Sequence, residues 1–402
     1  MNRAEIHPPR YQKEDEWDIL SNIVDMGKGP REIFFRTSPS FGPGGAECFL
    51  AVILFSAMRA SKDIEFASPI SQRLLNSVPA IQDIFHSWYP EFQKISVNAC
   101  TRQVNGKRQQ KGVGIFFSGG VDSFYTLLKH KDEITHLILV CGFDIKREDE
   151  KLWDQVLNMA RTVARETGKS LIQVETNLRE FSDAYGWWAH HYFGAGLASV
   201  ALRLSNVLKK IYIASAESYK NLQPSGSHPM LDPLWSTEDC EIVHDACEAS
   251  RVDKVEMLSH SDLAMRFLRV CWENQEGAYN CGACEKCLRT MVNLAINGVL
   301  GRCQTFKNTL DLNRVRKVKI PNRLVKVLWD ENLEAARKAG AAPELIRALE
   351  KAVDRYETEV VFDLLVDRAT RAVRPFVRAI KSVLLGDRKP VTRSGRLSNG
   401  NS

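Results

Sequence analysis

The sequence contains no long apolar segment. Its longest strongly apolar run, Cys48 to Met58, is well short of the ~20 residues that a membrane-spanning helix needs, so no transmembrane segment is expected. The stretch Met1 to Trp17 is charged and has no apolar centre, so we expect no secretory signal. Ten cysteines in 402 residues are too few for a disulfide scaffold. Together these absences predict a cytoplasmic protein with reduced thiols.

An excess of charge is also absent from most of the chain. The formal net charge is +6, and residues 361–402 account for all of it with nine Lys/Arg against three Asp/Glu. Residues 1–360 are balanced, so net charge gives no reason to expect that the body of the protein binds nucleic acid. The 44% hydrophobic and 26% charged residues are typical of globular proteins, and the length allows roughly two or three domains.

Strand-like and helix-like segments alternate through the chain, which predicts an α/β fold with a doubly wound parallel sheet. The expected division is an N-terminal α/β domain over 1–110, a central domain over 111–305, a helical region over 306–385 and a disordered tail over 386–402. The expected strands are 32–36, 63–67, 94–98, 113–117, 135–142, 170–175 and 210–214. The expected helices are 46–59, 69–88, 123–130, 149–167, 187–208, 323–340 and 342–385.

The most specific motif is Ser-Gly-Gly-Val-Asp-Ser, residues 118–123, between an apolar strand and a helix. The glycines permit a positive φ and close approach of a phosphate, and the helix N-terminus adds N–H donors and a favourable dipole. Ser118 and Ser123 add hydroxyl donors, and Asp122 fits beside a phosphate if Mg²⁺ lies between them. The motif lacks the residues of a Walker A loop and of a dinucleotide-binding loop. A turn without a ligand is the alternative.

A second motif is a cluster of cysteines. Cys271 is followed by Cys281-Gly-Ala-Cys284-Glu-Lys-Cys287, and four thiolates at this spacing suit a tetrahedral Zn²⁺. Gly282 fits the backbone bend between the first two ligands of the tight group. A 4Fe–4S cluster, which also takes four cysteines at short spacings, and four free cysteines are the alternatives.

The loop motif resembles the signature of the PP-loop ATP pyrophosphatases, which adenylate a substrate and release pyrophosphate. With the cysteine cluster downstream, residues 112–300 are similar to the 7-cyano-7-deazaguanine synthase (QueC) family, in which the zinc is structural. The resemblance implies an adenine nucleotide alpha hydrolase-like fold that uses ATP and Mg²⁺. The ATP-binding residues that it implies are Phe117, Ser118, Gly119, Gly120, Val121, Asp122, Ser123, Phe124, Tyr125, Thr126, Leu127 and Asp144, with Ser118, Asp122 and Ser123 in catalysis. For Asp144, a helix N-cap is the alternative.

The activity implied by the resemblance is that of an ATP-dependent ligase. Such an enzyme activates a carboxylate or an amide, for instance a 7-deazaguanine carboxylate, and transfers it to a nitrogen nucleophile. Ammonia is the family's acceptor. The region before the loop, more than a hundred residues that the family lacks, makes a protein or peptide amine an alternative acceptor. A homodimer is left open.

The acceptor side departs from the family. Ser225 to Pro233 stands where the family has a Ser-Gly-Tyr-Pro-Asp-type stretch. Because ligands of open α/β sheets bind beyond the carboxyl ends of the strands, we expect Glu217, His228 and Asp232 in the acceptor pocket. We expect Arg289 to face the nucleotide phosphates. The alternative for the loop after the last expected strand is a plain surface connection.

Two other functions compete with the ligase. One is a PP-loop RNA thiolase with an Fe–S cluster, which the balanced charge of residues 1–360 disfavours. The other is a non-catalytic ATP-binding or scaffold protein, which the intact loop motif disfavours. The expected partner is therefore a small-molecule carboxylate or deazapurine, and nucleic acid is not expected.

Overall fold

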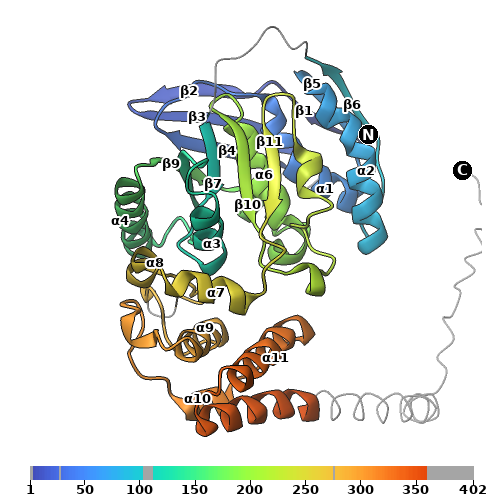
Figure 1. Ribbon diagram of the computed structural model, residues 1–402. Coiled ribbons are helices and arrows are strands. Elements are labelled where there is room, and N and C mark those ends of the chain that lie inside the picture. The colour runs from blue at the N-terminus through green and yellow to red at the C-terminus, as the bar shows by residue number, and fades with distance from the viewer. Residues whose placement is uncertain (1–2, 27–28, 103–111, 275–276, 360–402) are drawn as a thin grey trace, which may run out of the picture.

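The computed structural model describes residues 3–26, 29–102, 112–274 and 277–359 (Figure 1). Its centre is an eight-stranded sheet in the order β11-β10-β7-β8-β9-β4-β3-β2. The parallel strands are β7 (Gly112–Phe116), β8 (His136–Cys141), β9 (Ser170–Thr176), β10 (Leu208–Ala214) and β11 (Glu241–Asp245). The first four confirm expected strands, and β11 was not expected. After β7 the chain adds β8 and β9 on one side of it, and β10 and β11 lie on its other side. The loops that follow β7 and β10 therefore lead away from each other at this point of the sheet.

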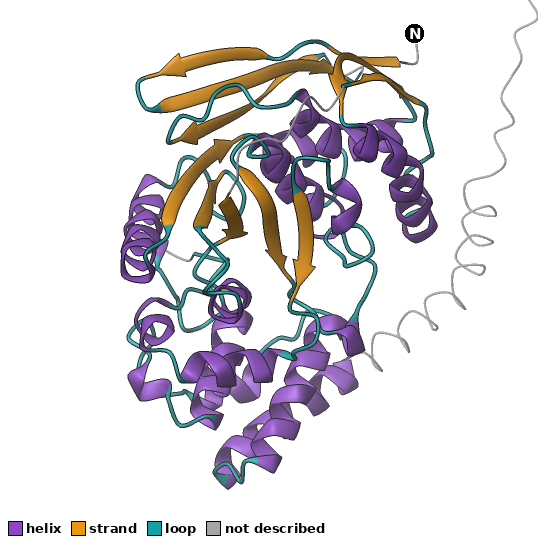
Figure 2. Ribbon diagram, turned by 45° about the horizontal axis from the view of Figure 1, so that its top comes forward, coloured by secondary structure: helices purple, strands orange, loops and turns teal. Residues whose placement is uncertain are grey.

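Helices cover both faces of the sheet (Figure 2). They are α1 (Leu50–Ala60), α2 (Gln72–Trp88), α3 (Val121–Lys129), α4 (Glu150–Thr167), α5 (Leu178–Ser182) and α6 (Phe193–Arg203). Ile115 and Leu137 belong to a core shared with α3 and α4. Phe116 and Ile138, their neighbours along β7 and β8, belong to a second core shared with α1, α2 and α6. This alternation explains why both strands are apolar throughout.

The N-terminal region contributes strands to the same sheet. β4 (Pro30–Ser38) pairs antiparallel with β9, and β3 (Trp17–Asp25) and β2 (Arg10–Glu14) continue the sheet to its edge. A separate three-stranded sheet consists of β1 (Arg3–Ile6), β5 (Asp63–Ile70) and β6 (Val97–Thr101). The main sheet therefore runs across the expected boundary at residue 110, and the division into domains stays a prediction.

Five helices gather beyond the carboxyl ends of the parallel strands (Figure 1). They are α7 (Arg251–Ser259), α8 (Asp262–Phe267), α9 (Glu285–Ile296), α10 (Leu312–Lys317) and α11 (Arg323–Lys338). The expected helix over 323–340 is confirmed as α11, and residues 343–359 are helical as the start of the expected 342–385 helix. The rest of that helix and the tail over 386–402 lie outside the described residues. Among the described helices, none is long and apolar enough to cross a membrane.

The expected helix over 187–208 is wrong in its bounds. A π-helical turn, η2 (Trp188–Tyr192), precedes α6, and α6 ends at Arg203. The first turn of α6 is closely packed, because a Cβ on Gly194 would lie 2.0 Å from the carbonyl oxygen of Gly226. The chain segments that carry these two glycines therefore touch through their backbones.

A buried carboxylate fastens the N-terminal strands to α6. Asp18 on β3 accepts hydrogen bonds from the hydroxyls of Tyr11 and Ser40, at 2.6 and 2.8 Å, and from two backbone N–H groups of the loop that follows Ser40. Arg203 Nη2 lies 3.8 Å from Asp18 Oδ2, and both side chains are fully buried. Burial opposes ionisation of Asp18, but the hydrogen bonds outweigh it, so the pKa of Asp18 is lowered.

We predict that Asp18→Asn lowers the free energy of unfolding by about 2–4 kcal/mol, because charged hydrogen bonds are lost and Arg203 stays buried without its counter-ion. Since the pKa of Asp18 is lowered in the folded state, its contribution is present above the unfolded-state pKa and disappears as the pH falls through the folded-state pKa. Urea unfolding at neutral and at strongly acidic pH measures both effects. Ser40→Ala, the control, removes one hydrogen bond and should cost about 0.5–1.5 kcal/mol. Equal urea midpoints for Asp18→Asn and wild type at neutral pH would contradict this role.

Candidate functional site

The glycine loop lies between β7 and α3, beside the place where the strand order reverses. Gly119 has a φ of +75°, and a Cβ there would lie 2.7 Å from the Met159 side chain. Gly120 is the N-cap of α3, so the unpaired first N–H groups of this helix are offered at the loop. The Arg269 N–H donates to the Gly119 carbonyl at 2.8 Å, which fixes the loop to the segment that leads into the cysteine cluster.

Most side chains of residues 117–127 face the protein interior. The buried apolar members are Phe117, Val121, Phe124 and Leu127. Ser123 Oγ donates to the Gly120 carbonyl at 3.1 Å, and Thr126 Oγ1 donates to Asp245 at 2.8 Å. Tyr125 donates to Glu248. Of the predicted ATP contacts in this segment, the polar groups that are not bonded within the fold in this way are therefore Ser118 and the loop backbone, while Asp122 has ion-pair partners of its own.

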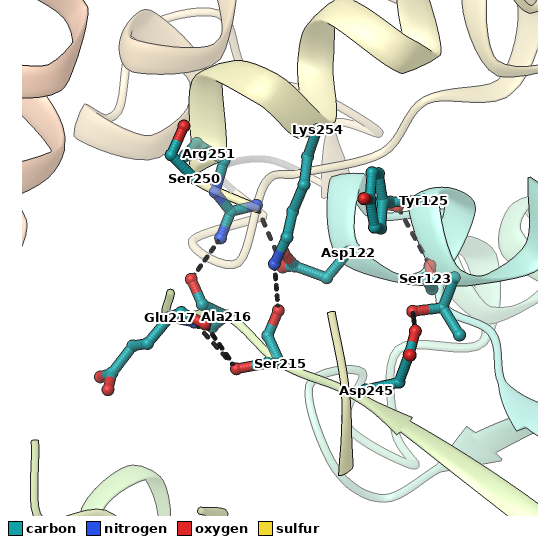
Figure 3. Close-up of polar contacts among 12 residues, drawn as sticks. Asp122, Ser123, Tyr125, Ser215, Ala216, Glu217, Asp245, Ser250, Arg251 and Lys254 are labelled. Atoms are coloured by element: carbon teal, nitrogen blue, oxygen red, sulfur yellow. Dashed lines mark hydrogen bonds and ion pairs between the residues drawn. The ribbon is translucent and has the colours of Figure 1, made fainter. Parts of the chain in front are cut away.

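Asp122 is paired with two cations from the start of α7 (Figure 3). Its Oδ2 lies 3.0 Å from Arg251 Nη1, and its Oδ1 lies 3.2 Å from Lys254 Nζ. Lys254 is buried and also donates to the Ser215 carbonyl at 2.7 Å, directly after β10. Burial would raise the pKa of Asp122, but the charges of Arg251 and Lys254 outweigh it and lower the pKa. Asp122 is thus an ionised link between α3, β10 and α7.

The four predicted metal ligands lie together. The Sγ atoms of Cys271, Cys281, Cys284 and Cys287 all lie within 4.8 Å of one another, with 4.0 Å between Cys271 and Cys284 and 3.9 Å between Cys281 and Cys287. Zn–S bonds of about 2.3 Å in a tetrahedron place sulfurs about 3.8 Å apart, so the set could hold a single ion. The φ of +64° at Gly282 confirms the predicted bend.

Hydrogen bonds to sulfur favour the thiolate form of Cys284, whereas burial raises the pKa of Cys281 and the hydrogen bond to Cys284 raises the pKa of Cys287. The Cys284 N–H donates to Cys281 Sγ at 3.3 Å, and the Cys287 N–H donates to Cys284 Sγ at 3.4 Å. Hydrogen bonds from the side chain and backbone of Cys287 lower the pKa of Cys284 to about 6. Because a metal binds thiolates, Cys284 is the ligand that is best prepared for an ion in the free protein.

The cysteine cluster fixes the start of α9, which carries the cations Lys286 and Arg289. Lys286 lies between two of the cysteines and lines a cavity, where burial and the charge of Arg251 lower its pKa. Arg289 Nε donates to Glu285 Oε1 at 2.7 Å. The same oxygen accepts a hydrogen bond from Trp329 Nε1 of α11 at 2.8 Å. The orientation of α9 is therefore set from two sides, by the cysteines and by α11.

The cavity has a volume of about 1840 Å³ and lies between the loop after β10 and the helices α9 to α11. Its basic lining residues are Lys220, Arg251, Lys286, Arg289, Arg314, Lys317, Lys319 and Arg323, and its acidic ones are Glu217, Glu273, Glu285 and Glu331. Cations therefore outnumber acids two to one. Arg251 contacts Asp122 and also lines the cavity, so it joins the glycine loop to this space.

The structure separates the residues predicted for the acceptor side. Glu217 and Arg289 line the cavity. His228 is buried with its ring 4.8 Å from that of Trp88, and Asp232 is fully buried and bonded to His244 Nδ1 at 2.7 Å. The last two residues are thus in the core, and the structure does not support direct contact between them and an acceptor in this cavity.

Asp144 is the predicted ATP contact that lies outside residues 117–127. Asp144 is exposed after β8, and its alternative role as a helix N-cap is wrong, because Asp149 caps α4 by accepting the Leu152 N–H at 3.2 Å. Sequence reasoning missed Arg251, Lys254, Lys286 and the cavity. Only Lys286 had a local signal, because it lies within the cysteine motif next to the predicted Arg289.

Comparison of the chain with protein-family models, with curated proteins and with solved structures finds no significant match.

We predict one metal ion per chain, held by the four cysteines. Cys287→Ser should remove the ion and cost about 3 kcal/mol or more of stability, because metal bound only by the folded chain supplies folding free energy. Elemental analysis and thermal unfolding with and without a chelator measure the two effects. The control is Cys303→Ala, which alters a buried cysteine outside the cluster and should keep the ion. A full complement of metal in Cys287→Ser would contradict the assignment.

Proposed function

We propose that the protein is an ATP-dependent ligase that forms AMP and pyrophosphate while it adenylates a carboxylate or an amide and passes it to a nitrogen nucleophile. The observation that carries this proposal is the position of the Ser118–Ser123 loop, beside the reversal of strand order at β7 and β10. Ligands of open α/β sheets bind at such a reversal. Helices on both faces of the sheet also support the doubly wound PP-loop fold that the resemblance implies.

The phosphates of ATP would bind where N–H donors and positively charged side chains lie near the glycine loop. The glycine loop and the N-terminus of α3 offer N–H donors. Arg251 and Lys254 contact Asp122, and Lys286 feels the charge of the same carboxylate. Three cations around one acid favour a polyanion electrostatically. Mg²⁺, which would arrive with ATP and neutralise phosphate charge, could be held by Asp122 once Arg251 or Lys254 turns to the phosphates.

We assign the cysteine cluster to a structural zinc ion. The sulfur separations of 4.0 and 3.9 Å suit four thiolates on one ion. A 4Fe–4S cluster attaches each thiolate to a different iron and so needs sulfurs that are farther apart, which disfavours the thiolase alternative. The zinc would act through position, because it holds α9 so that Lys286 and Arg289 face the cavity.

Glu217 is the best candidate for handling the proton of the acceptor nitrogen. It lines the cavity directly after β10, and its Oε2 accepts the Gln223 N–H at 3.1 Å. Burial raises the pKa of Glu217, and a carboxylate with a raised pKa is a better proton acceptor near neutral pH. The deazaguanine carboxylate and ammonia rest on the resemblance alone, and a larger amine rests on the region before the loop that the family lacks.

We predict AMP and pyrophosphate from ATP in the presence of 7-carboxy-7-deazaguanine and ammonium. Lys286→Met should lower kcat/KM for ATP at least about tenfold, or about 1.4 kcal/mol, because it removes a cation beside the loop. It is a cleaner probe than Asp122→Ala, which also leaves the buried Lys254 without its counter-ion.

Lys151→Met, at an exposed position of α4, is the matched control and should keep full activity. Anion-exchange chromatography separates the products, and thermal unfolding checks that each variant folds. ADP and phosphate as products would contradict the proposal. Binding of ATP without turnover of this or any other carboxylate or amide would favour the scaffold alternative.

A further inference from the structure

One wall of the cavity is basic and has fewer acids than cations. Residues 312–329, which cover α10 and the start of α11, contain six Lys/Arg and no Asp/Glu, and of these six Arg314 pairs with Asp311 and Lys326 pairs with Asp330 and Glu357. Among the cavity-lining cations, Lys220, Lys317, Lys319 and Arg323 form no ion pair with any residue that the structure describes. These positive charges line the same cavity, although residues 1–360 as a whole are neutral. Such a surface attracts an extended anion.

The same cavity carries exposed aromatic rings. Trp187 and Trp272 line it and are 73% and 60% exposed. Two of the six large hydrophobic side chains that are exposed in the described residues thus line this one cavity. They come from two separate segments of the chain, so the fold brings them to the same cavity, and gathered apolar exposure of this kind marks a binding surface.

We propose that this cavity binds a single-stranded nucleic acid, with phosphates against Lys317, Lys319 and Arg323 and with unpaired bases stacked on Trp187 and Trp272. The combination of a positively charged groove and aromatic faces is how proteins bind single strands. An acidic polypeptide would use the cations but would gain little from flat aromatic faces. A duplex has its bases already stacked on one another.

The size of the cavity agrees with this occupant. Pockets for small ligands have volumes of about 300–1000 Å³. The volume of about 1840 Å³ leaves room for several nucleotides, and no residue of the glycine loop lines this space. A strand bound here would lie next to Arg251, and through it next to Asp122 and the loop. The proposal requires binding only and does not rest on the ligase activity.

Fluorescence anisotropy with labelled single-stranded RNA and DNA 12-mers of mixed sequence, without ATP, tests the proposal on the full chain. Lys317→Glu/Lys319→Glu should weaken binding at least tenfold. It should also reduce the slope of log Kd against log salt by about 1.4, because each single-strand phosphate contact contributes about 0.7. Trp187→Ala/Trp272→Ala should weaken binding at least tenfold with an unchanged salt slope, and Trp187→Phe/Trp272→Phe should keep most of the affinity because stacking is retained.

Arg10→Glu/Lys13→Glu is the matched charge control. It alters two exposed cations on β2, at the edge of the sheet opposite β11, and should leave binding within twofold of wild type. Thermal unfolding verifies that every variant folds. Polyglutamate that binds as tightly as the 12-mer, or affinity that does not respond to Trp→Ala, would assign the cavity to an acidic polypeptide and overturn the proposal. Tighter binding of the matched duplex, or no binding of either 12-mer at low salt, would overturn it as well.

Discussion

Four cysteine sulfurs within 4.8 Å of one another constrain everything beyond the carboxyl ends of the sheet. Cys271 ends a segment whose backbone also holds the carbonyl of Gly119 in the glycine loop. The other three sulfurs are at the start of α9, which joins two cores: Met291 packs with the sheet, and Leu288 packs with α11. The positions of the glycine loop, the cavity and the C-terminal helices therefore depend on these four cysteines, which surround a space of about the size of one ion.

The charge balance of the site follows from this arrangement. Lys254 is buried, and its desolvation is offset by Asp122 and by the Ser215 carbonyl. The acidic residue of the glycine motif is thus a counter-ion for α7 in the free protein, in addition to any part that it has in holding a metal. Arg251 and Lys286 line the cavity, and Arg251 is at the same time held by Asp122, so an anion in the cavity would compete with this carboxylate for Arg251.

The parts of the fold that the sequence predicts are those with a local signal. β7, β8 and β10 are short apolar runs because both of their faces are buried, and the cysteine spacing is itself the signature of the metal site. β2 has no such signal, since all five of its residues are exposed. Arg251 and Lys254 reach Asp122 from about 130 residues away in the chain, and no local pattern marks a pairing of this kind.

Net charge is a sum along the chain and carries no information on position, which is why it did not indicate the basic cavity. Many acids of residues 1–360 are used in ion pairs away from it, such as Glu47 with Arg102 and Asp18 with Arg203. The packing of α10 and α11 against α9 leaves Lys317 and other cations on one wall without comparable partners in the described parts of the chain. A neutral composition is therefore compatible with a strongly polarised site. The polarity of this cavity is a property of the tertiary structure, because it depends on which charges are paired elsewhere.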